Sequence, residues 1–143
     1  MNKLNVAVLF GYALTPVAAV ADGFDEFAKS LGAGDAHQMA ISGVFGHTAD
    51  RLKDPRSMQI VQAATKKTQA YLVGCLEYRS KNSFAAYVPG YSVWKLGVTK
   101  QGKPQLTFKT DDAAFWNAMC VGNGFRDGTE LMRAVFEKMK NKL

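Results

Sequence analysis

The stretch that decides the expected fold runs from Asp54 to Arg79 and reads DPRSMQIVQAATKKTQAYLVGCLEYR. Its apolar or small residues recur every three or four positions, which is the spacing of one face of an α-helix. Asp54 followed by Pro55 is a typical helix start, because the carboxylate caps free amides and proline fits the first turn. The pattern predicts one long helix, with these positions on its buried face: Met58, Val61, Ala64, Thr68, Tyr71, Leu72, Cys75 and Leu76.

Shorter helices are predicted before and after this stretch. Residues 22–31 place apolar side chains on one helical face, and Asp35 can cap a second helix that runs to about Leu52. Gly43 and Gly46 weaken that second prediction, since glycine inside a helix costs about 1 kcal/mol relative to alanine. Further helices are expected over 111–121 and from Thr129 to the lysine-rich end of the chain.

Between these helices the period changes to that of strands. Residues 84–88, 91–99 and 105–109 are rich in aromatic and β-branched residues, and turn residues separate them. In the second run Tyr91 and Val93 point one way, while Trp94 and Leu96 point the other way. The predicted fold is therefore α+β and mainly α-helical: helices, then a short antiparallel hairpin or three-stranded sheet, then two C-terminal helices.

Residues 1–21 have the layout of a secretory signal peptide. Lys3 precedes an apolar run from Leu4 to Leu14, Pro16 can break its helix, and the small residues 19–21 suit cleavage after Ala21. This predicts an exported chain in which 22–143 form one small globular domain. Two alternatives are an uncleaved membrane anchor and a buried first strand that begins at Leu4.

The charge balance is basic but dispersed along the chain. The net charge is +6, and loss of Lys3, which is the only charged residue among 1–21, leaves +5. The densest basic stretches are Lys66–Lys67 and the lysines at 138, 140 and 142, which are too few for a nucleic-acid patch. For an exported protein this charge favours anionic lipid, cell-wall polymer or an acidic protein as partner. We predict no nucleic-acid partner and no stable membrane span after cleavage.

The two cysteines, Cys75 and Cys120, are expected to form a disulfide, because an even number of cysteines in an oxidising compartment favours pairing. The alternative is two separate buried thiols that pack as small apolar side chains.

Few residues have the spacing of a catalytic or metal site. His37 and His47 are ten positions apart, without a further ligand pattern, so we predict no metal and no cofactor. A hydrolase would have to use His47 with Asp50 or with the Asp111–Asp112 pair.

Two segments are candidates for binding. Residues 122–128 are rich in glycine and lead into a helix, so their amides together with Arg126 could hold an anion, although a plain turn explains them as well. Tyr87, Tyr91 and Trp94 make the strand region rich in aromatic residues, which are frequent at protein interfaces and in sheet cores.

The function favoured by these features is that of an exported, periplasmic or secreted, non-catalytic protein of the bacterial envelope. It would recognise another envelope protein, as an immunity protein, inhibitor or accessory subunit does, through a flat surface that exposes Tyr87, Tyr91 and Trp94. The first alternative is a carrier of a small ligand or lipid, and the second is the hydrolase. The carrier would use an apolar pocket lined by Met39, Phe84, Trp94, Phe108, Phe115 and Met119.

Overall fold

The computed structural model describes residues 17–143, with side chains from Gly23 onward. Residues 1–16 of the predicted signal lie outside this part, and the predicted cleavage point after Ala21 falls within the first described helix, α2 (Val17–Ser30). Within the described residues, no helix has the length and apolar character required to cross a bilayer.

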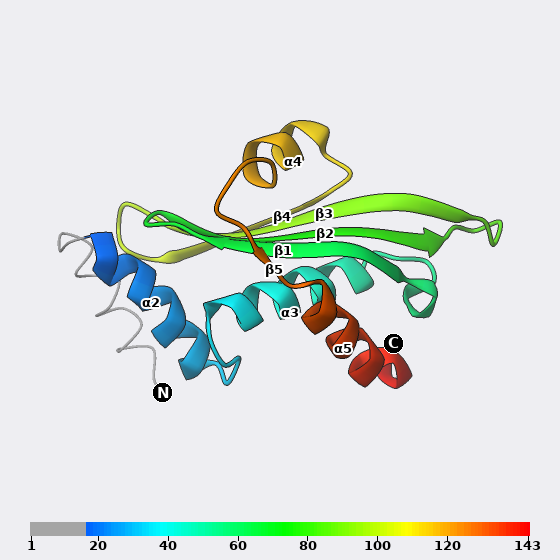
Figure 1. Ribbon diagram of the computed structural model, residues 1–143, viewed down its shortest axis with the longest axis horizontal. Coiled ribbons are helices and arrows are strands. Elements are labelled where there is room, and N and C mark those ends of the chain that lie inside the picture. Colours follow the sequence, from blue (N-terminus) through cyan, green and yellow to red (C-terminus); the bar gives the residue numbers. More distant parts are fainter. Residues whose placement is uncertain (1–16) are drawn as a thin grey trace.

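A five-stranded antiparallel sheet forms the centre of the molecule (Figure 1). Its strands are β1 (Gln59–Lys67), β2 (Tyr71–Lys81), β3 (Tyr87–Val98), β4 (Pro104–Thr110) and the short β5 (Arg126–Asp127). Their order across the sheet is β4-β3-β2-β1-β5, so β4 is one edge, and β5 pairs with β1 only at Ala64 and Thr65. Four consecutive strands thus form a meander, and the chain returns to pair beside its first strand.

The prediction of one long helix over Asp54–Arg79 was wrong. Pro55–Ser57 form a single 3₁₀ turn, η1, and the rest of the stretch is the β1–β2 hairpin. Two features hide the alternation typical of strands. A bulge between Ile60 and Gln62 shifts the register of β1, and β2 is buried on both faces, so Leu72 to Leu76 are all buried. A strand buried on both faces has an apolar run that periodicity alone does not distinguish from a helix.

Three helices cover one face of the sheet and enclose the main core (Figure 1). They are α2, α3 (Ala36–Ala49) and α5 (Thr129–Met139), which is followed by the short turn η2 (Lys140–Lys142). Asp35 caps α3 as predicted, and its carboxylate accepts a hydrogen bond from the Gln38 amide. Gly74 of β2 allows close packing of α3, because a Cβ there would lie 2.6 Å from the Ala40 carbonyl oxygen.

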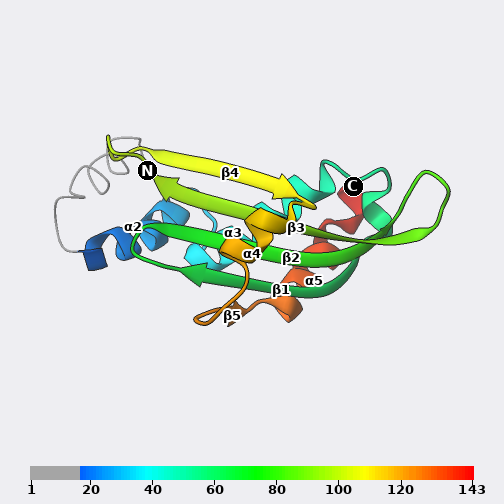
Figure 2. The ribbon, with the colours of Figure 1, turned by 90° about the horizontal axis from the view of Figure 1, so that it is seen from above.

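The remaining helix, α4 (Ala113–Met119), lies on the opposite face of the sheet (Figures 1 and 2). It covers a second, smaller cluster centred on Val73, Cys75 and Val93. Strand β5 separates α4 from α5, so the two helices do not form a C-terminal pair. The protein is therefore α+β with the sheet as its principal element, and the prediction of a mainly helical fold with a minor sheet was wrong because β1 and β2 were assigned to a helix.

Candidate binding surface

The disulfide predicted between Cys75 and Cys120 is present and holds α4 against the sheet. Cys75 lies in the middle of β2, and Cys120 is the C-cap residue of α4. At the other end of α4, the Asp112 carboxylate accepts a hydrogen bond from the Phe115 amide at 2.9 Å. A helix of seven residues is too short to be stable alone, so the bridge and the cap determine where its side chains lie.

We call the face that carries α4 the outer face. Four lysines on it lie over aromatic rings at distances typical of cation–π contacts. Lys81 lies 5.5 Å from the Tyr87 ring centroid, and Lys109 lies 5.0 Å from that of Phe115. The other two pairs are Lys95 over Tyr71 and Lys66 over Phe125, both at 5.2 Å.

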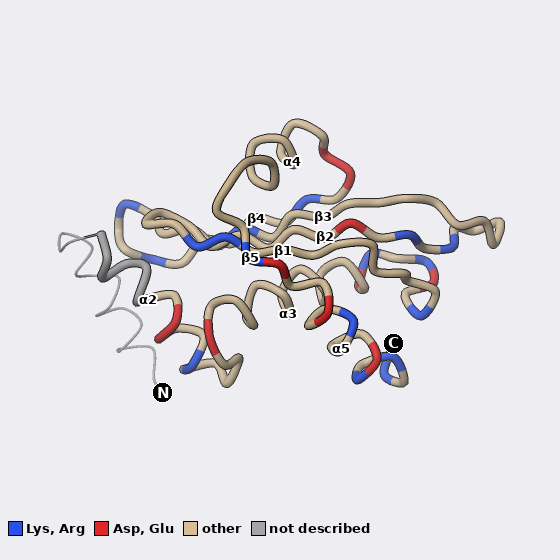
Figure 3. The backbone as a smooth tube through the Cα atoms, in the orientation of Figure 1, with Lys and Arg blue, Asp and Glu red and all other residues tan. Residues whose placement is uncertain are grey.

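Positive charge predominates on this part of the sheet, although Glu77 lies on the same face and the Lys109 Nζ lies 3.7 Å from the Asp112 carboxylate. From Tyr78 to Thr110 the sequence contains six lysines and arginines and no aspartate or glutamate. The strand register places Arg79, Lys81, Lys95 and Lys109 on the outer face, because they pair with or alternate with Val73 and Val93. Figure 3 shows lysines and arginines, in blue, along the strands of the sheet. Their field favours a partner that carries negative charge.

A hollow of about 540 Å³ lies between α4 and the part of the sheet nearest the β2–β3 turn. Its aromatic side is formed by Tyr91 and Trp116, whose rings meet edge to face with centroids 5.3 Å apart. Val61 and Pro89 are apolar and exposed, and Arg79 and Glu77 supply opposite charges. The hollow therefore offers apolar surface, aromatic edges and charge together, as protein interfaces do.

The three aromatic residues considered as a recognition surface lie on two faces of the sheet. Tyr87 and Tyr91 lie on the outer face, whereas Trp94 points to the opposite side, is 5% exposed and packs in the main core. Trp116 of α4 occupies a place beside Tyr91 and was missed by the sequence analysis. Only the tertiary position of α4 brings it there, since it is 25 residues from Tyr91 in the sequence.

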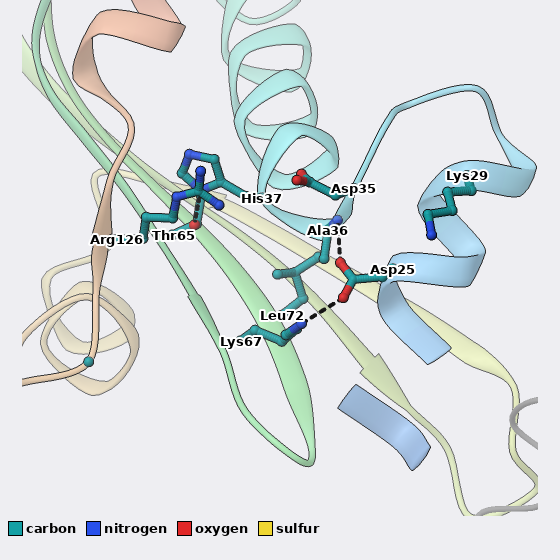
Figure 4. A pocket seen from close by; sticks show the side chains of 10 residues that line it. Asp25, Lys29, Asp35, Ala36, His37, Thr65, Lys67, Leu72 and Arg126 are labelled. Carbon is teal, nitrogen blue, oxygen red and sulfur yellow. Dashed lines mark hydrogen bonds and ion pairs between the residues drawn. The ribbon is translucent and has the colours of Figure 1, made fainter. Parts of the chain in front are cut away.

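Arg126 lies elsewhere, in a polar pocket of about 520 Å³ at one end of the helix layer (Figure 4). The Asp25 carboxylate accepts hydrogen bonds there from the Ala36 amide at 2.9 Å and from Lys67 at 2.7 Å. Burial raises the pKa of Asp25, but these two hydrogen bonds outweigh it, so the pKa lies below its ordinary value. The two carboxylates that line this pocket, Asp25 and Asp35, offset most of the charge of its three cations, Lys29, Lys67 and Arg126.

His37 lines the same pocket and is also explained by its surroundings. Its Nδ1 lies 2.5 Å from Thr65 Oγ1, in a hydrogen bond between two buried side chains. Burial lowers the pKa of His37, and the Arg126 guanidinium lowers it further, while Asp35 and Asp127 act in the opposite direction. Because Thr65 is only 4% exposed, its hydroxyl is not accessible as a nucleophile.

At the end of the glycine-rich segment, the amides that lead into α5 have partners within the protein. The Gly128 amide donates to the Ala63 carbonyl at 2.8 Å, and the Thr129 amide donates to the Asp127 carboxylate at 3.2 Å. Gly122 and Gly124 have positive φ angles of 123° and 87°, which glycine adopts at little cost. This segment is therefore a turn that leads the chain into β5 and α5.

An apolar groove of about 600 Å³ lies on the helix side, between α2, α3 and the β3–β4 edge. Of the residues predicted to line a carrier pocket, Met39 and Trp94 line this groove, and Phe108 lies next to it against His47. Phe84, Phe115 and Met119 lie elsewhere. His47 and Asp50 are at its rim, and the His47 Nδ1–H donates to the Gly43 carbonyl at 2.9 Å. The ring is thus oriented by its own helix and by Phe108, whose centroid is 5.2 Å away.

The two carboxylates considered for a hydrolase have structural roles. The Asp111 carboxylate accepts a hydrogen bond from the Tyr91 amide at 3.1 Å, and Asp112 caps α4. In residues 17–143 no three histidine, cysteine, aspartate or glutamate side chains gather in a way that could hold a metal ion. Comparison with protein-family models, curated proteins and solved structures finds no match to this chain.

Proposed function

We propose that this protein is an exported, non-catalytic binding domain that recognises an acidic protein of the bacterial envelope through its outer face. The observation that carries the proposal is the set of lysines held over aromatic rings on the face that the helix layer leaves open. Side chains that are already held in place lose little freedom on binding, and aromatic residues are among those that contribute most to the energy of interfaces.

The contact is expected to centre on the hollow beside α4. Tyr91 and Trp116 are partly buried there. Arg79 lines the hollow, and Lys81 follows it on the same face of β2, toward the turn. An acidic partner segment would meet Arg79 and Lys81 while its apolar side chains fill the hollow. The disulfide supports the proposed location, because disulfides persist in oxidising compartments such as the periplasm.

The direct test is site-specific photo-crosslinking of the full chain in the envelope of the cell that produces it. A benzophenone amino acid at Tyr87, which is 38% exposed on the outer face, should capture one partner protein. The same probe at the exposed Lys138 of α5, on the helix layer, is the matched control and should capture none. Equal capture at both positions, or no protein adduct at Tyr87, would refute the proposal.

Two substitutions then test the chemistry of the contact. Trp116→Ala is expected to weaken binding of the captured partner by roughly 30-fold, the effect of removing a central aromatic residue from an interface. Arg79→Glu should slow association, and the loss should shrink as salt is added, because exposed charges act mainly through long-range attraction. Unchanged binding in both variants would exclude this face as the contact.

A second candidate function is carriage of an apolar ligand in the groove of the helix layer. The observation that favours it is that Leu31 and Leu106, at 62% and 45% exposed, stand on opposite sides of this groove. Native mass spectrometry of the protein purified from the envelope should then show a bound lipid or other apolar molecule. Leu106→Asp should remove that molecule and leave crosslinking at Tyr87 unchanged.

A further inference from the structure

The turn between β2 and β3 projects beyond the rest of the molecule (Figures 1 and 2). It presents Phe84, Ala85, Ala86, Tyr87 and Val88, five consecutive apolar or aromatic residues that are all exposed. Phe84 is 90% exposed, which is more than any other large apolar side chain among the described residues. Nothing among residues 23–143 covers this apolar run, so it does not contribute to the core, and exposed apolar patches of this kind mark contact sites.

The turn is held in one conformation. The Asn82 side-chain oxygen accepts hydrogen bonds from the amides of Phe84 at 2.9 Å and Ala86 at 3.1 Å. Backbone bonds between Asn82 and both Ala85 and Ala86 close the loop, and Ala85 has a positive φ of 60°. A non-glycine residue with this φ is uncommon outside sites where the surrounding contacts impose it. These bonds hold the backbone of the turn in one conformation, and in it the Phe84 side chain is exposed.

Cations surround the base of this turn. Arg79 and Lys81 lie at the end of β2, and η1 brings Arg56 close, because the Ser57 hydroxyl accepts a hydrogen bond from the Lys81 amide at 2.8 Å. Asp54 is the acidic residue on that neighbouring segment, and the hairpin itself contains none between Tyr78 and Thr110. An apolar tip with cations near its base is complementary to a bilayer with anionic headgroups, because the tip can enter the interface while the cations bind the headgroups.

We propose that the β2–β3 turn is a lipid-contact site, in which Phe84 inserts among the headgroups of an anionic membrane surface while Arg79 and Lys81 bind the lipid phosphates. The shape of the β2–β3 turn differs from that of the hollow beside α4. A protruding tip can insert into a lipid surface, whereas a hollow accommodates the side chains of a protein partner. The two sites share Arg79 and Lys81, but Phe84 belongs to the turn alone and Trp116 to the hollow alone, so variants at these two positions test each site separately.

Vesicle binding by the full chain purified from the envelope tests the site. The protein should bind vesicles that contain phosphatidylglycerol and should bind pure phosphatidylcholine vesicles several-fold more weakly. Phe84→Ala should reduce the partition coefficient about tenfold, as expected for the loss of one buried phenylalanine side chain. Val121→Ala is the matched control, since Val121 is 61% exposed on the loop after α4, and it should leave binding unchanged.

A reporter variant shows where the tip lies. In Phe84→Trp, the added indole should shift its emission to shorter wavelength on phosphatidylglycerol vesicles and should be quenched by brominated lipid chains. Absence of vesicle binding, equal binding to both lipids, or full binding by Phe84→Ala would overturn the proposal. A photo-crosslinker at position 84 that captures a protein and no lipid would overturn it as well.

Discussion

Removal of the Cys75–Cys120 bridge gives the most quantitative test of how the outer face is built. The cysteines are 45 residues apart in the sequence. In the chain-entropy model, a loop of that length constrains the unfolded state by about 13 to 14 cal/mol/K, or about 4 kcal/mol at 25 °C. For a domain of this size, a loss of 4 kcal/mol corresponds to a fall in melting temperature of about 15 °C.

The observed loss should be smaller than this limit if α4 leaves the sheet before the domain unfolds. None of the residues of α4 is fully buried, although the helix covers Val73 and Val93, which are 0% and 1% exposed. Without the bridge, α4 is held by partly buried contacts, by the Asp112 cap and by the hydrogen bonds between Asp111 and Tyr91 that precede the helix. Local detachment then becomes an alternative to global unfolding, and its free energy is read from amide exchange.

Two measurements separate these outcomes. Urea unfolding of the Cys75→Ala, Cys120→Ala double variant gives the global free energy, and alanine avoids placing a polar hydroxyl at position 75, which is 4% exposed. Hydrogen exchange of residues 113–119 reports on α4 itself. A variant with an unchanged unfolding free energy and unchanged exchange in α4 would refute the argument that the bridge positions this helix.

Three further predictions concern other parts of the chain. Gly46→Ala should stabilise the protein by about 1 kcal/mol, since a Cβ there meets open space in α3, whereas Gly43→Ala should destabilise it because the Cβ would lie 2.5 Å from the Trp94 ring; equal effects in urea unfolding would contradict this difference. Folding lowers the pKa of His37, so the unfolded chain binds a proton there more readily than the folded protein does, and the free energy of unfolding falls as the pH drops below about 6.5. His37→Gln should make the free energy of unfolding less dependent on pH in this range, and an unchanged dependence would exclude His37 as its source. Mass spectrometry of the periplasmic protein should find a chain that begins at Asp22, and retention of residue 1 would disprove the predicted cleavage.

Local signals along the sequence predicted some elements correctly. Asp35 caps α3, and α3 continues through Gly43 and Gly46 because the first allows Trp94 to pack against the helix. The alternation in β3 was also predicted correctly, with Tyr91 on one side and Trp94 on the other. The cap and the alternation depend on residues close in sequence, where capping and side-chain period act directly, whereas the contact of Gly43 with Trp94 is tertiary.

The β1–β2 hairpin was not predicted, because its pattern results from tertiary structure. Helices cover one face of β2 and α4 covers the other, so its buried run contains no polar alternation. The one local sign against a helix was Gly74 in the middle of the apolar run, which is unfavourable in a helix interior. The structure shows its actual role, the close approach of α3 to the sheet.

The outer face could not be predicted for a similar reason. Lys95 of β3 contacts Tyr71 of β2, and Lys66 of β1 contacts the Phe125 ring in the loop after α4. Both contacts join segments that only the folded structure brings together. The prediction of a dispersed charge followed the sequence alone and overlooked the absence of acidic residues from 78 to 110. That gap in the acidic residues was the available signal, and it would have directed attention to β2, β3 and β4.

The disulfide connects the proposed location of the protein with its proposed contact surface. Trp116 and Phe115 reach the outer face because α4 is held there, and a seven-residue helix has little stability of its own. In a reducing compartment the bridge does not persist, so the hollow beside Tyr91 lacks a fixed wall. In an oxidising compartment the bridge forms and completes it. Export and binding are therefore coupled in this interpretation, because the same covalent bond that requires an oxidising compartment positions the aromatic side of the contact.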